Sequence, residues 1–135
     1  MNKIFDGQPV IISGGLGDIG FATAEAFALK GASIALGDIY PENTAEPFLK
    51  KLRARGVSVD YAEVDVANEN KIKQWIDGVE ETLGVPQLII ANAAIVNRAG
   101  IHEITPDQWR RELDVNLNGA FFLVQTATGR PRERS

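Results

Sequence analysis

The residues with the clearest chemical potential form a glycine cluster, Ser13-Gly14-Gly15-Leu16-Gly17-Asp18-Ile19-Gly20. The cluster follows the apolar run Val10-Ile11-Ile12 and precedes an alanine-rich segment, residues 21–30. A glycine turn between a strand and a helix lets a pyrophosphate approach the backbone, and free amides at the helix start face the anion. Three of the glycines satisfy G-x-G-x-x-G, a pattern that ordinary glycine turns share. Support for a phosphate site must therefore come from the rest of the chain.

Two aspartates follow apolar runs that have the length of strands. Asp38 comes after residues 33–37, and a carboxylate there can accept hydrogen bonds from the ribose hydroxyls of an adenosine. It would also repel a 2′-phosphate, so it favours NAD over NADP; a solvated loop or a helix cap is the alternative. Asp65 follows residues 57–64, where it lies either beside an adenine ring or as the cap of the next helix.

Two asparagines stand at positions that invite a function. Asn92 follows Ile89-Ile90-Ala91, at the end of an expected strand where ligands of open α/β sheets gather, although an Asx turn would explain it as well. Asn116 lies within an expected helix and is followed by Gly119. Because asparagine competes for backbone hydrogen bonds in a helix, we expect a kink or an exposed carbonyl there, or else a tolerated surface residue.

Apolar runs and helical patterns alternate along the chain, which indicates βαβ units around a parallel sheet. We expect strands over residues 9–13, 33–37, 57–64 and 87–94. We expect helices over residues 18–30, after a polar turn that contains Pro41 and Glu42 as far as Arg55, and along the apolar stripe from Ile72 to Leu83. The predicted fold class is α/β: a Rossmann-like doubly wound parallel sheet in three layers (α/β/α), truncated after the fourth strand and its following helix. In the order 3-2-1-4 the fourth strand is an edge, although its apolar run suits burial on both faces.

The last helix begins at a recognisable cap and carries one apolar side. Thr105, Pro106 and Gln108 match a capping box with proline at the first helical position. Beyond Gly119 the helix is apolar nearly all round, which calls for burial on both faces. The apolar side comprises Trp109, Leu113, Leu117, Ala120, Phe121 and Val124.

Composition narrows the classes of function. The 135 residues have the size of one domain, a net charge of −4 and no cysteine. No basic stripe indicates nucleic-acid binding, no run is long enough to span a membrane, and the single histidine does not suggest a metal site. A cytoplasmic location is the default expectation. We divide the chain into a partial NAD-binding domain, residues 1–128, and a polar tail, residues 129–135, expected to be disordered.

Taken together, the motifs resemble the short-chain dehydrogenase/reductase family, specifically the N-terminal half of its one-domain fold. The family's T-G-x-x-x-G-x-G looks like residues 13–20, with Ser13 in place of threonine and Asp18 in place of glycine. Asp-Val after the third strand, Asn-Asn-Ala-Gly after the fourth and Val-Asn-x-x-Gly in the last helix are similar to residues 65–66, 91–94 and 115–119. The resemblance implies cofactor contacts by Ser13, Gly14, Gly15, Gly17, Asp18, Ile19, Gly20, Asp38, Ile39, Asp65, Val66, Asn92, Ala93 and Ala94, and makes Asn116 a member of the catalytic tetrad.

The resemblance implies an NAD(P)-binding oxidoreductase that transfers hydride between nicotinamide and an unknown small alcohol or carbonyl compound. The family's catalytic serine and Tyr-x-x-x-Lys are expected beyond residue 135, since Thr44 and Asp65 stand four residues after Tyr40 and Tyr61. The alternatives are a catalytically inactive NAD-binding module and an interaction protein that uses the edge strand and the last helix. An uncovered edge strand and helix predict a homo-oligomer or aggregation.

Overall fold

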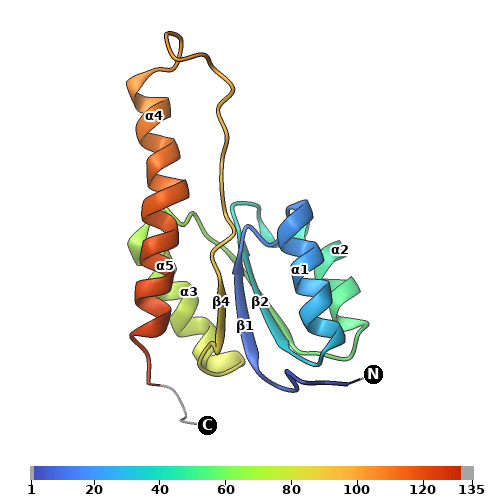
Figure 1. The fold of residues 1–135 in the computed structure, drawn as a ribbon. Helices are drawn as coiled ribbons and strands as arrows, with labels where there is room; N and C mark the ends of the chain where they lie inside the picture. Colours follow the sequence, from blue (N-terminus) through green and yellow to red (C-terminus); the bar gives the residue numbers. More distant parts are fainter. Residues whose placement is uncertain (1, 132–135) are drawn as a thin grey trace.

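A four-stranded parallel sheet forms the centre of the computed structural model, which describes residues 2–131. The strand order is β3-β2-β1-β4 (Figure 1). The strands are β1 (Pro9–Ser13), β2 (Ser33–Asp38), β3 (Val59–Glu63) and β4 (Leu88–Ile90). The chain winds outward from β1 to β3 and then returns to place β4 on the other side of β1. The sequence-based prediction of a doubly wound α/β fold is therefore confirmed.

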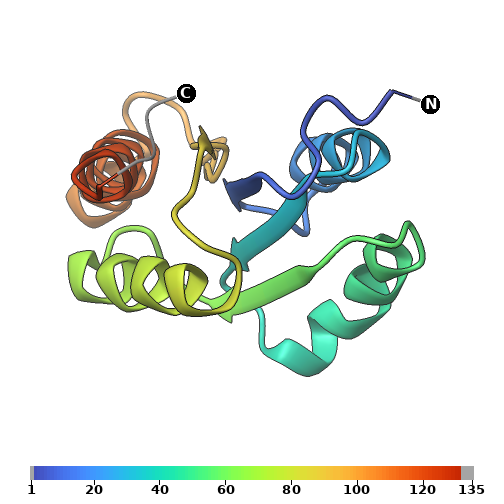
Figure 2. The same cartoon turned by 90° about the horizontal axis from the view of Figure 1, so that it is seen from below.

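Helices cover both faces of this sheet and complete the three layers (Figure 2). One face carries α1 and α2, and the other carries α3 and the long helical stretch formed by α4, η1 and α5. The bounds are α1 (Asp18–Leu29), α2 (Glu42–Arg53), α3 (Glu69–Thr82), α4 (Pro106–Leu113), the π-helical turn η1 (Asp114–Gly119) and α5 (Ala120–Thr128).

The alternation of side chains along β1 divides the core into two layers. Val10 and Ile12 point to one layer and Ile11 to the other, because successive residues of a strand face opposite sides of the sheet. All three are fully buried. The first layer also contains Ile34, Leu36, Leu49 and Leu52, and the second contains Ile72, Trp75, Ile76 and Leu123.

The fourth strand is shorter and less buried than its sequence predicts. Only Leu88–Ile90 pair with β1, whereas the expected strand covered residues 87–94. Its residues are half-buried rather than buried on both faces, because β4 is an edge among the described strands. The chain leaves the sheet after Ile90 and runs as a long loop to α4 (Figure 1).

The last helical stretch begins as predicted but buries the opposite side. Thr105 Oγ1 accepts from Gln108 N at 3.1 Å, and Gln108 Oε1 accepts from Thr105 N at 2.9 Å. The predicted apolar side is exposed; five of its members, which we call the outer stripe, are between 39% and 62% exposed. The outer stripe consists of Trp109, Leu113, Leu117, Phe121 and Val124. The buried side consists of Val115, Gly119, Leu123 and Ala127.

The outer face of α5 is exposed in the single chain, in agreement with the expectation of an uncovered helix. Leu123 on the inner face is fully buried in the layer that contains α3. A Cβ at Gly119 would lie 2.6 Å from Val66 Cγ2, so this glycine lets the helix approach the loop after β3 closely. The close approach explains why Val115 and Leu123, rather than the outer stripe, reach the core.

The residues after α5 are fastened to α3. Arg130 forms ion pairs with Asp77 at 2.6 Å and with Glu80 at 2.8 Å, and the pKa of Asp77 is lowered mainly by this hydrogen bond from Arg130. The expected disordered tail began at residue 129, but its described part, residues 129–131, contains this contact. The remainder of that expectation, residues 132–135, lies outside the described residues.

Gly37 in β2 allows Trp75 to pack against the sheet. A Cβ at Gly37 would lie 2.6 Å from Trp75 Cη2 and 2.7 Å from Val64 Cγ1. We expect Gly37→Ala to lower the free energy of unfolding by about 1–3 kcal/mol, because the ring must shift in a packed core. Urea unfolding measures the change. The matched control is Gly78→Ala in α3, where the new Cβ meets open space and should stabilise the helix by up to about 1 kcal/mol. Equal stabilities of the two variants would contradict this packing argument.

Candidate functional site

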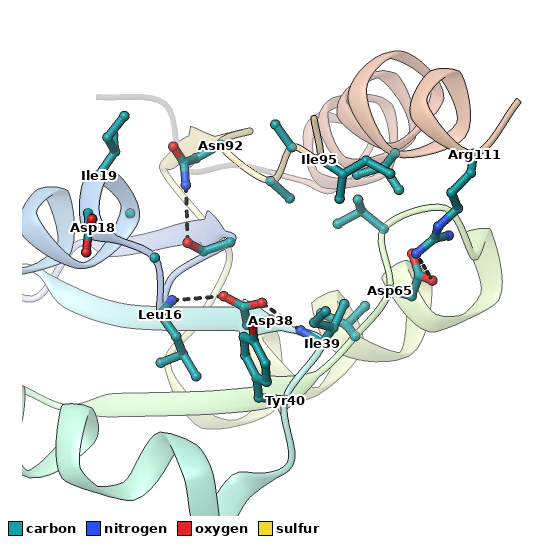
Figure 3. Close-up of a pocket in the computed structure, with 18 residues that line it drawn as sticks. Leu16, Asp18, Ile19, Asp38, Ile39, Tyr40, Asp65, Asn92, Ile95 and Arg111 are labelled. Carbon is teal, nitrogen blue, oxygen red and sulfur yellow. Dashed lines mark hydrogen bonds and ion pairs between the residues drawn. The ribbon is translucent and has the colours of Figure 1, made fainter. Parts of the chain in front are cut away.

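A cavity of about 560 Å³ lies at the carboxyl ends of the strands. This edge, where β1 and β4 send their following segments in different directions, is where ligands of open α/β sheets bind. Figure 3 shows side chains from the start of α1, the end of β2, the loops after β3 and β4, and α4 around one space. Twelve of the fifteen predicted site residues line it: Gly14, Gly17, Asp18, Ile19, Gly20, Asp38, Ile39, Asp65, Val66, Asn92, Ala93 and Ala94.

The glycine turn between β1 and α1 forms one wall of the cavity. Gly14 has a φ of +65°, a backbone conformation that glycine adopts without strain. A Cβ at Gly20 would lie 2.2 Å from the Gly14 carbonyl oxygen, so only glycine permits this contact between turn and helix. Gly15 does not line the cavity; a Cβ there would meet Leu36 Cδ2 at 2.7 Å, which gives this glycine a packing role.

Asp18 occupies the first position of α1 and is exposed to the cavity. Gly17 is the N-cap residue, and no side-chain hydrogen bond caps this helix among the described residues. Asp18 is therefore a residue of the first turn and not the cap of the helix. A carboxylate in the first turn of a helix interacts favourably with the helix dipole. Its charge also lies where a bound anion would meet the free amides.

Ser13 and Asn92 join the ends of β1 and β4. The buried Ser13 hydroxyl oxygen accepts from Asn92 N at 3.0 Å and from Ala93 N at 3.1 Å. The Asn92 side-chain amide donates to the Gly14 carbonyl at 3.2 Å (Figure 3). It also donates to the Ser13 carbonyl at 3.2 Å. The Asn92 side chain thus fixes the glycine turn, and Asn92 lines the cavity; its role in binding stays a prediction.

Asp38 ends β2 and faces the glycine turn (Figure 3). One carboxylate oxygen accepts from Leu16 N at 3.0 Å and the other from Ile39 N at 2.8 Å. The carboxylate is therefore fixed by backbone amides on two sides while it lines the cavity. Each oxygen retains a further acceptor position for a ligand.

Tyr61 in β3 supports the loop beyond Asp38. Its hydroxyl donates to the Tyr40 carbonyl and lies 3.4 Å from the Asp38 carbonyl oxygen. Burial, followed by the nearby negative charge of Asp38, raises the pKa of Tyr61 above its ordinary value. The hydroxyl consequently remains a donor at all physiological pH values and holds Tyr40 at the cavity wall.

Asp65 and Arg111 form the opposite wall (Figure 3). Arg111 Nη2 lies 2.8 Å from one Asp65 oxygen, and Ala67 N donates to the other at 3.0 Å. Burial raises the pKa of Asp65, but the hydrogen bonds from Arg111 and Ala67 outweigh it, so this pKa lies below its ordinary value. Asp65 accepts from the backbone two residues on, but it does not cap the next helix, because the N-cap of α3 is Asn68, whose side chain accepts from Lys71 N. Asp65 lines the cavity, and its place beside an adenine ring stays a prediction.

Asn116 fastens the helical stretch to the loop after β4. Its side-chain oxygen accepts from Ile95 N and its amide donates to the Ile95 carbonyl, both at 2.8 Å. One turn earlier, a carboxylate oxygen of Glu112 accepts from Asn97 N. Asn116 lies in the π-helical turn η1, in agreement with the expectation of an irregular helix at this position. It does not itself line the cavity, and its catalytic role stays a prediction.

Sequence reasoning missed six residues that line the cavity: Leu16, Tyr40, Val64, Ile95, Arg111 and Val115. Leu16 and Val64 adjoin predicted residues, so neighbourhood alone could have found them. Arg111 lacked any local signal, because its partner Asp65 lies 46 positions earlier and only the packing of α4 brings them together. Among the described residues, no group of three or more histidine, aspartate or glutamate side chains could hold a metal ion. Nor is any helix in residues 2–131 long and apolar enough to cross a membrane.

The two hydrogen bonds between the Asn116 side chain and the Ile95 backbone, which we call the Asn116 clamp, can be tested directly. Asn116→Ala removes both hydrogen bonds to Ile95, and we expect a loss of about 1–2 kcal/mol in the free energy of unfolding. Amide hydrogen exchange at Ile95 should become faster, because this amide loses its acceptor. Asn118→Ala is the matched control, since Asn118 in the same turn donates to Asp114 of the same helical stretch. Unchanged exchange at Ile95 in Asn116→Ala would contradict the clamp.

Comparisons with known proteins agree with this geometry. The model of the short chain dehydrogenase family matches residues 8–132. An uncharacterized oxidoreductase of Thermotoga maritima is 31% identical over 119 residues, which cover 88% of this chain and 46% of that protein. The 3beta-hydroxysteroid dehydrogenase 2 of Eggerthella lenta is 32% identical, covering 93% of this chain and 48% of its own length. The chain thus spans about half the length of the relatives that it matches.

Solved structures show the same fold. An NAD+-bound xylitol dehydrogenase superposes with a TM-score of 0.87 at 28% identity, covering 93% of this chain and 48% of the other. Carveol dehydrogenase from Mycobacterium avium, in complex with NAD, gives a TM-score of 0.85 at 26% identity, covering 96% of this chain and 50% of the other. Strand order, glycine turn and family match lead to one conclusion: the chain belongs to the short-chain dehydrogenase/reductase family.

Proposed function

We propose that this chain binds a nicotinamide dinucleotide and serves an oxidoreductase that transfers hydride between that cofactor and a small alcohol or carbonyl compound. The observation that carries the proposal is the Asp38 carboxylate, held by Leu16 N at 3.0 Å beside the glycine turn. This arrangement sets a ribose-binding carboxylate next to amides that can receive a pyrophosphate. Xylitol dehydrogenase and carveol dehydrogenase, both similar in structure to this chain, contain bound NAD, which supports the proposal.

We assign the preferred cofactor as NAD rather than NADP. The Asp38 oxygens each have an acceptor position free for a ribose hydroxyl, whereas a 2′-phosphate would place negative charge against this carboxylate. Asp18 adds a second negative charge on the same side of the cavity. The Asp38 carboxylate is held by the backbone amides of Leu16 and Ile39, so among residues 2–131 it has no basic side chain bonded to it that would attract a phosphate.

The remaining predicted residues have complementary parts in this proposal. The turn from Gly14 to Gly20 receives the pyrophosphate, and Asp65 with Val66 borders the adenine end. Asn92, Ala93 and Ala94 lie along the path toward the nicotinamide, and Asn116 holds that path through Ile95. The Tyr-x-x-x-Lys pair that the family resemblance implies is not among the 135 residues. The proposal therefore assigns these residues the binding and orientation of the cofactor, and a cytoplasmic location is part of it.

Binding of NADH to the protein, measured by calorimetry, tests the proposal. We expect Asp38→Asn to weaken NADH binding about tenfold, because hydrogen bonds to a charged acceptor are lost. NADPH binding should change little or improve, since the repulsion of its 2′-phosphate falls. Asp60→Asn is the control, as Asp60 lies in β3 and does not line the cavity. Absence of any heat and of any thermal shift with NADH would refute the dinucleotide proposal and leave the interaction protein as the favoured alternative.

A second copy of this chain is the proposed partner of the outer stripe. The five apolar side chains follow one side of the α4–α5 stretch over its whole length, and such a patch on a surface marks an interaction site. In a two-fold dimer the same helix face of each copy packs against its counterpart, so this face must be self-complementary. A continuous apolar stripe meets this requirement. The unpaired edge of β4 is the other proposed contact of a homo-oligomer.

Charges introduced on the outer stripe should separate the copies. We expect the double substitution Leu117→Glu and Phe121→Glu to convert the protein to a monomer, because burying two carboxylates in an apolar interface is costly. Size-exclusion chromatography with light scattering measures the molar mass. Val96→Glu is the control, since Val96 is 82% exposed and lies in the loop after β4, outside the stripe. A monomeric protein without any substitution would rule out this interface.

A further inference from the structure

Asp18 is the charged residue of the glycine turn and stands at the start of α1 (Figure 3). It is exposed and lines the cavity. The other two aspartates of the cavity wall have partners, since Asp38 is held by two backbone amides and Asp65 by Arg111. Within residues 2–131 the Asp18 carboxylate forms no hydrogen bond and no ion pair. Its charge is therefore not offset by a neighbouring side chain.

Stabilisation of α1 does not account for the place of this charge. A carboxylate in the first turn of a helix interacts favourably with the helix dipole, whatever surrounds that helix. Glu69 occupies the same first position in α3, yet it does not line the cavity. Both residues can stabilise their helices, but of the two only Asp18 also puts its charge where a ligand binds. What distinguishes Asp18 is therefore its effect on a ligand in the cavity.

The start of α1 adjoins the end of β4. A Cβ at Gly20 would lie 2.8 Å from Asn92 Nδ2, which donates to the Gly14 carbonyl at 3.2 Å. Asn92 begins the segment that we assign to the path toward the nicotinamide. Asp38 ends β2, and β2 and β4 lie on opposite sides of β1. Asp18 thus lies toward the nicotinamide side of the site, whereas Asp38 lies on the ribose side.

The cavity as a whole carries an excess of negative charge. Three aspartates and one arginine line it, which gives a formal charge of −2. A Coulomb interaction needs no contact between the charges, and at low salt it extends over about 10 Å or more. A positive charge on a ligand therefore favours its binding in this cavity, and a negative charge disfavours it.

We propose that Asp18 makes the site discriminate between the two oxidation states of the cofactor and favour the oxidised one. The oxidised nicotinamide ring carries a positive charge that the reduced ring lacks, whereas the pyrophosphate is the same in both. Repulsion of the pyrophosphate by Asp18 therefore cancels in the ratio of the two dissociation constants, and the attraction of the charged ring remains. The inference rests on the proposed function, because it assumes that the cavity binds a nicotinamide dinucleotide.

A preference for NAD+ suits the oxidation of an alcohol. In that direction the alcohol carbon gives a hydride to the nicotinamide ring, the hydroxyl proton is released, and a carbonyl compound and NADH are formed. The ring loses its positive charge in this step, so its attraction to Asp18 is lost as well. Asp18 thereby lowers the affinity for NADH relative to NAD+, which favours exchange of the reduced cofactor for the oxidised one.

The test measures the dissociation constants of NAD+ and NADH for the intact protein by calorimetry and takes the ratio of NADH to NAD+. We expect Asp18→Asn to lower this ratio about threefold at low salt, the size of a solvent-weakened interaction between single charges. Glu69→Gln is the matched control, because it removes a carboxylate from the same position of a helix outside the cavity. This control should leave the ratio unchanged, and so should Asp18→Glu, which keeps the charge.

Ionic strength supplies a readout that a purely structural role would not move. Raising the salt concentration from about 0.02 M to about 0.5 M shortens the range of the interaction. The ratio for the unsubstituted protein should therefore fall toward that of Asp18→Asn, whose own ratio should respond less. Urea unfolding of Asp18→Asn verifies that the variant is folded.

A change of both dissociation constants by the same factor in Asp18→Asn would overturn the inference, because it would leave the ratio where it was. An equal fall of the ratio in Glu69→Gln, or in Asp18→Glu, would overturn it too. In each of these cases both cofactors still bind, and the proposed function stands. If neither cofactor binds the unsubstituted protein, the proposed function fails as well, so the two failures are distinguishable.

Discussion

The buried hydroxyl of Ser13 connects the two strands on which the site depends. It accepts from two consecutive amides after β4, and those amides have no sheet partner because β4 ends at Ile90. In the other direction, the Asn92 side-chain amide donates to the carbonyls of Ser13 and Gly14. The glycine turn and the loop after β4 are thus fixed to each other before any ligand arrives. Every other part of the cavity is arranged around this junction.

The helical stretch from α4 to α5 completes the cavity from outside the sheet. Asn116, Glu112 and Arg111 each contact a loop rather than another helix, and the loops are those after β4 and β3. The close approach at Gly119 brings the stretch near enough for these contacts. Loops at the carboxyl edge of the sheet, which would otherwise be free to move, are in this way held by a rigid element.

The sequence predicted the parts of the fold that depend on local patterns. Three local predictions were confirmed: the glycine turn, the capping box at Thr105 and the amphipathic stripe of α3. Each depends on residues that are close together in the chain. The side of the last helix that is buried was not identified from the sequence. Large apolar residues marked the outer stripe, but the small residues Gly119 and Ala127 mark the face that packs closely. Hydrophobic periodicity alone does not distinguish a core face from a face left for a partner.

In the candidate site, too, residues with a local sequence signal were predicted and residues placed by tertiary packing were not. Asp38 and Asn92 were predicted because a strand end fixes where such a side chain goes. Arg111 was not, since its place depends on how far α4 lies from β3, a distance set by tertiary packing. The shortened β4 has a similar origin: Ala91 has strand character, but Ser13 captures the amide of Asn92 and turns the chain out of the sheet.

The π-helical turn at residues 114–119 determines toward which side of the helix the side chains after it point. Residues four apart in an α-helix advance by about 40° beyond a full turn, so a stripe with this spacing winds around the helix. A wider turn rotates less per residue and cancels part of that drift, which keeps Trp109, Leu113, Leu117 and Phe121 on one side. The π-helical turn, which holds more residues per turn than an α-helix, therefore keeps the outer stripe on one side of the helix. If one residue were deleted from this turn, the chain could not keep both the alignment of the outer stripe and the contact of Asn116 with Ile95.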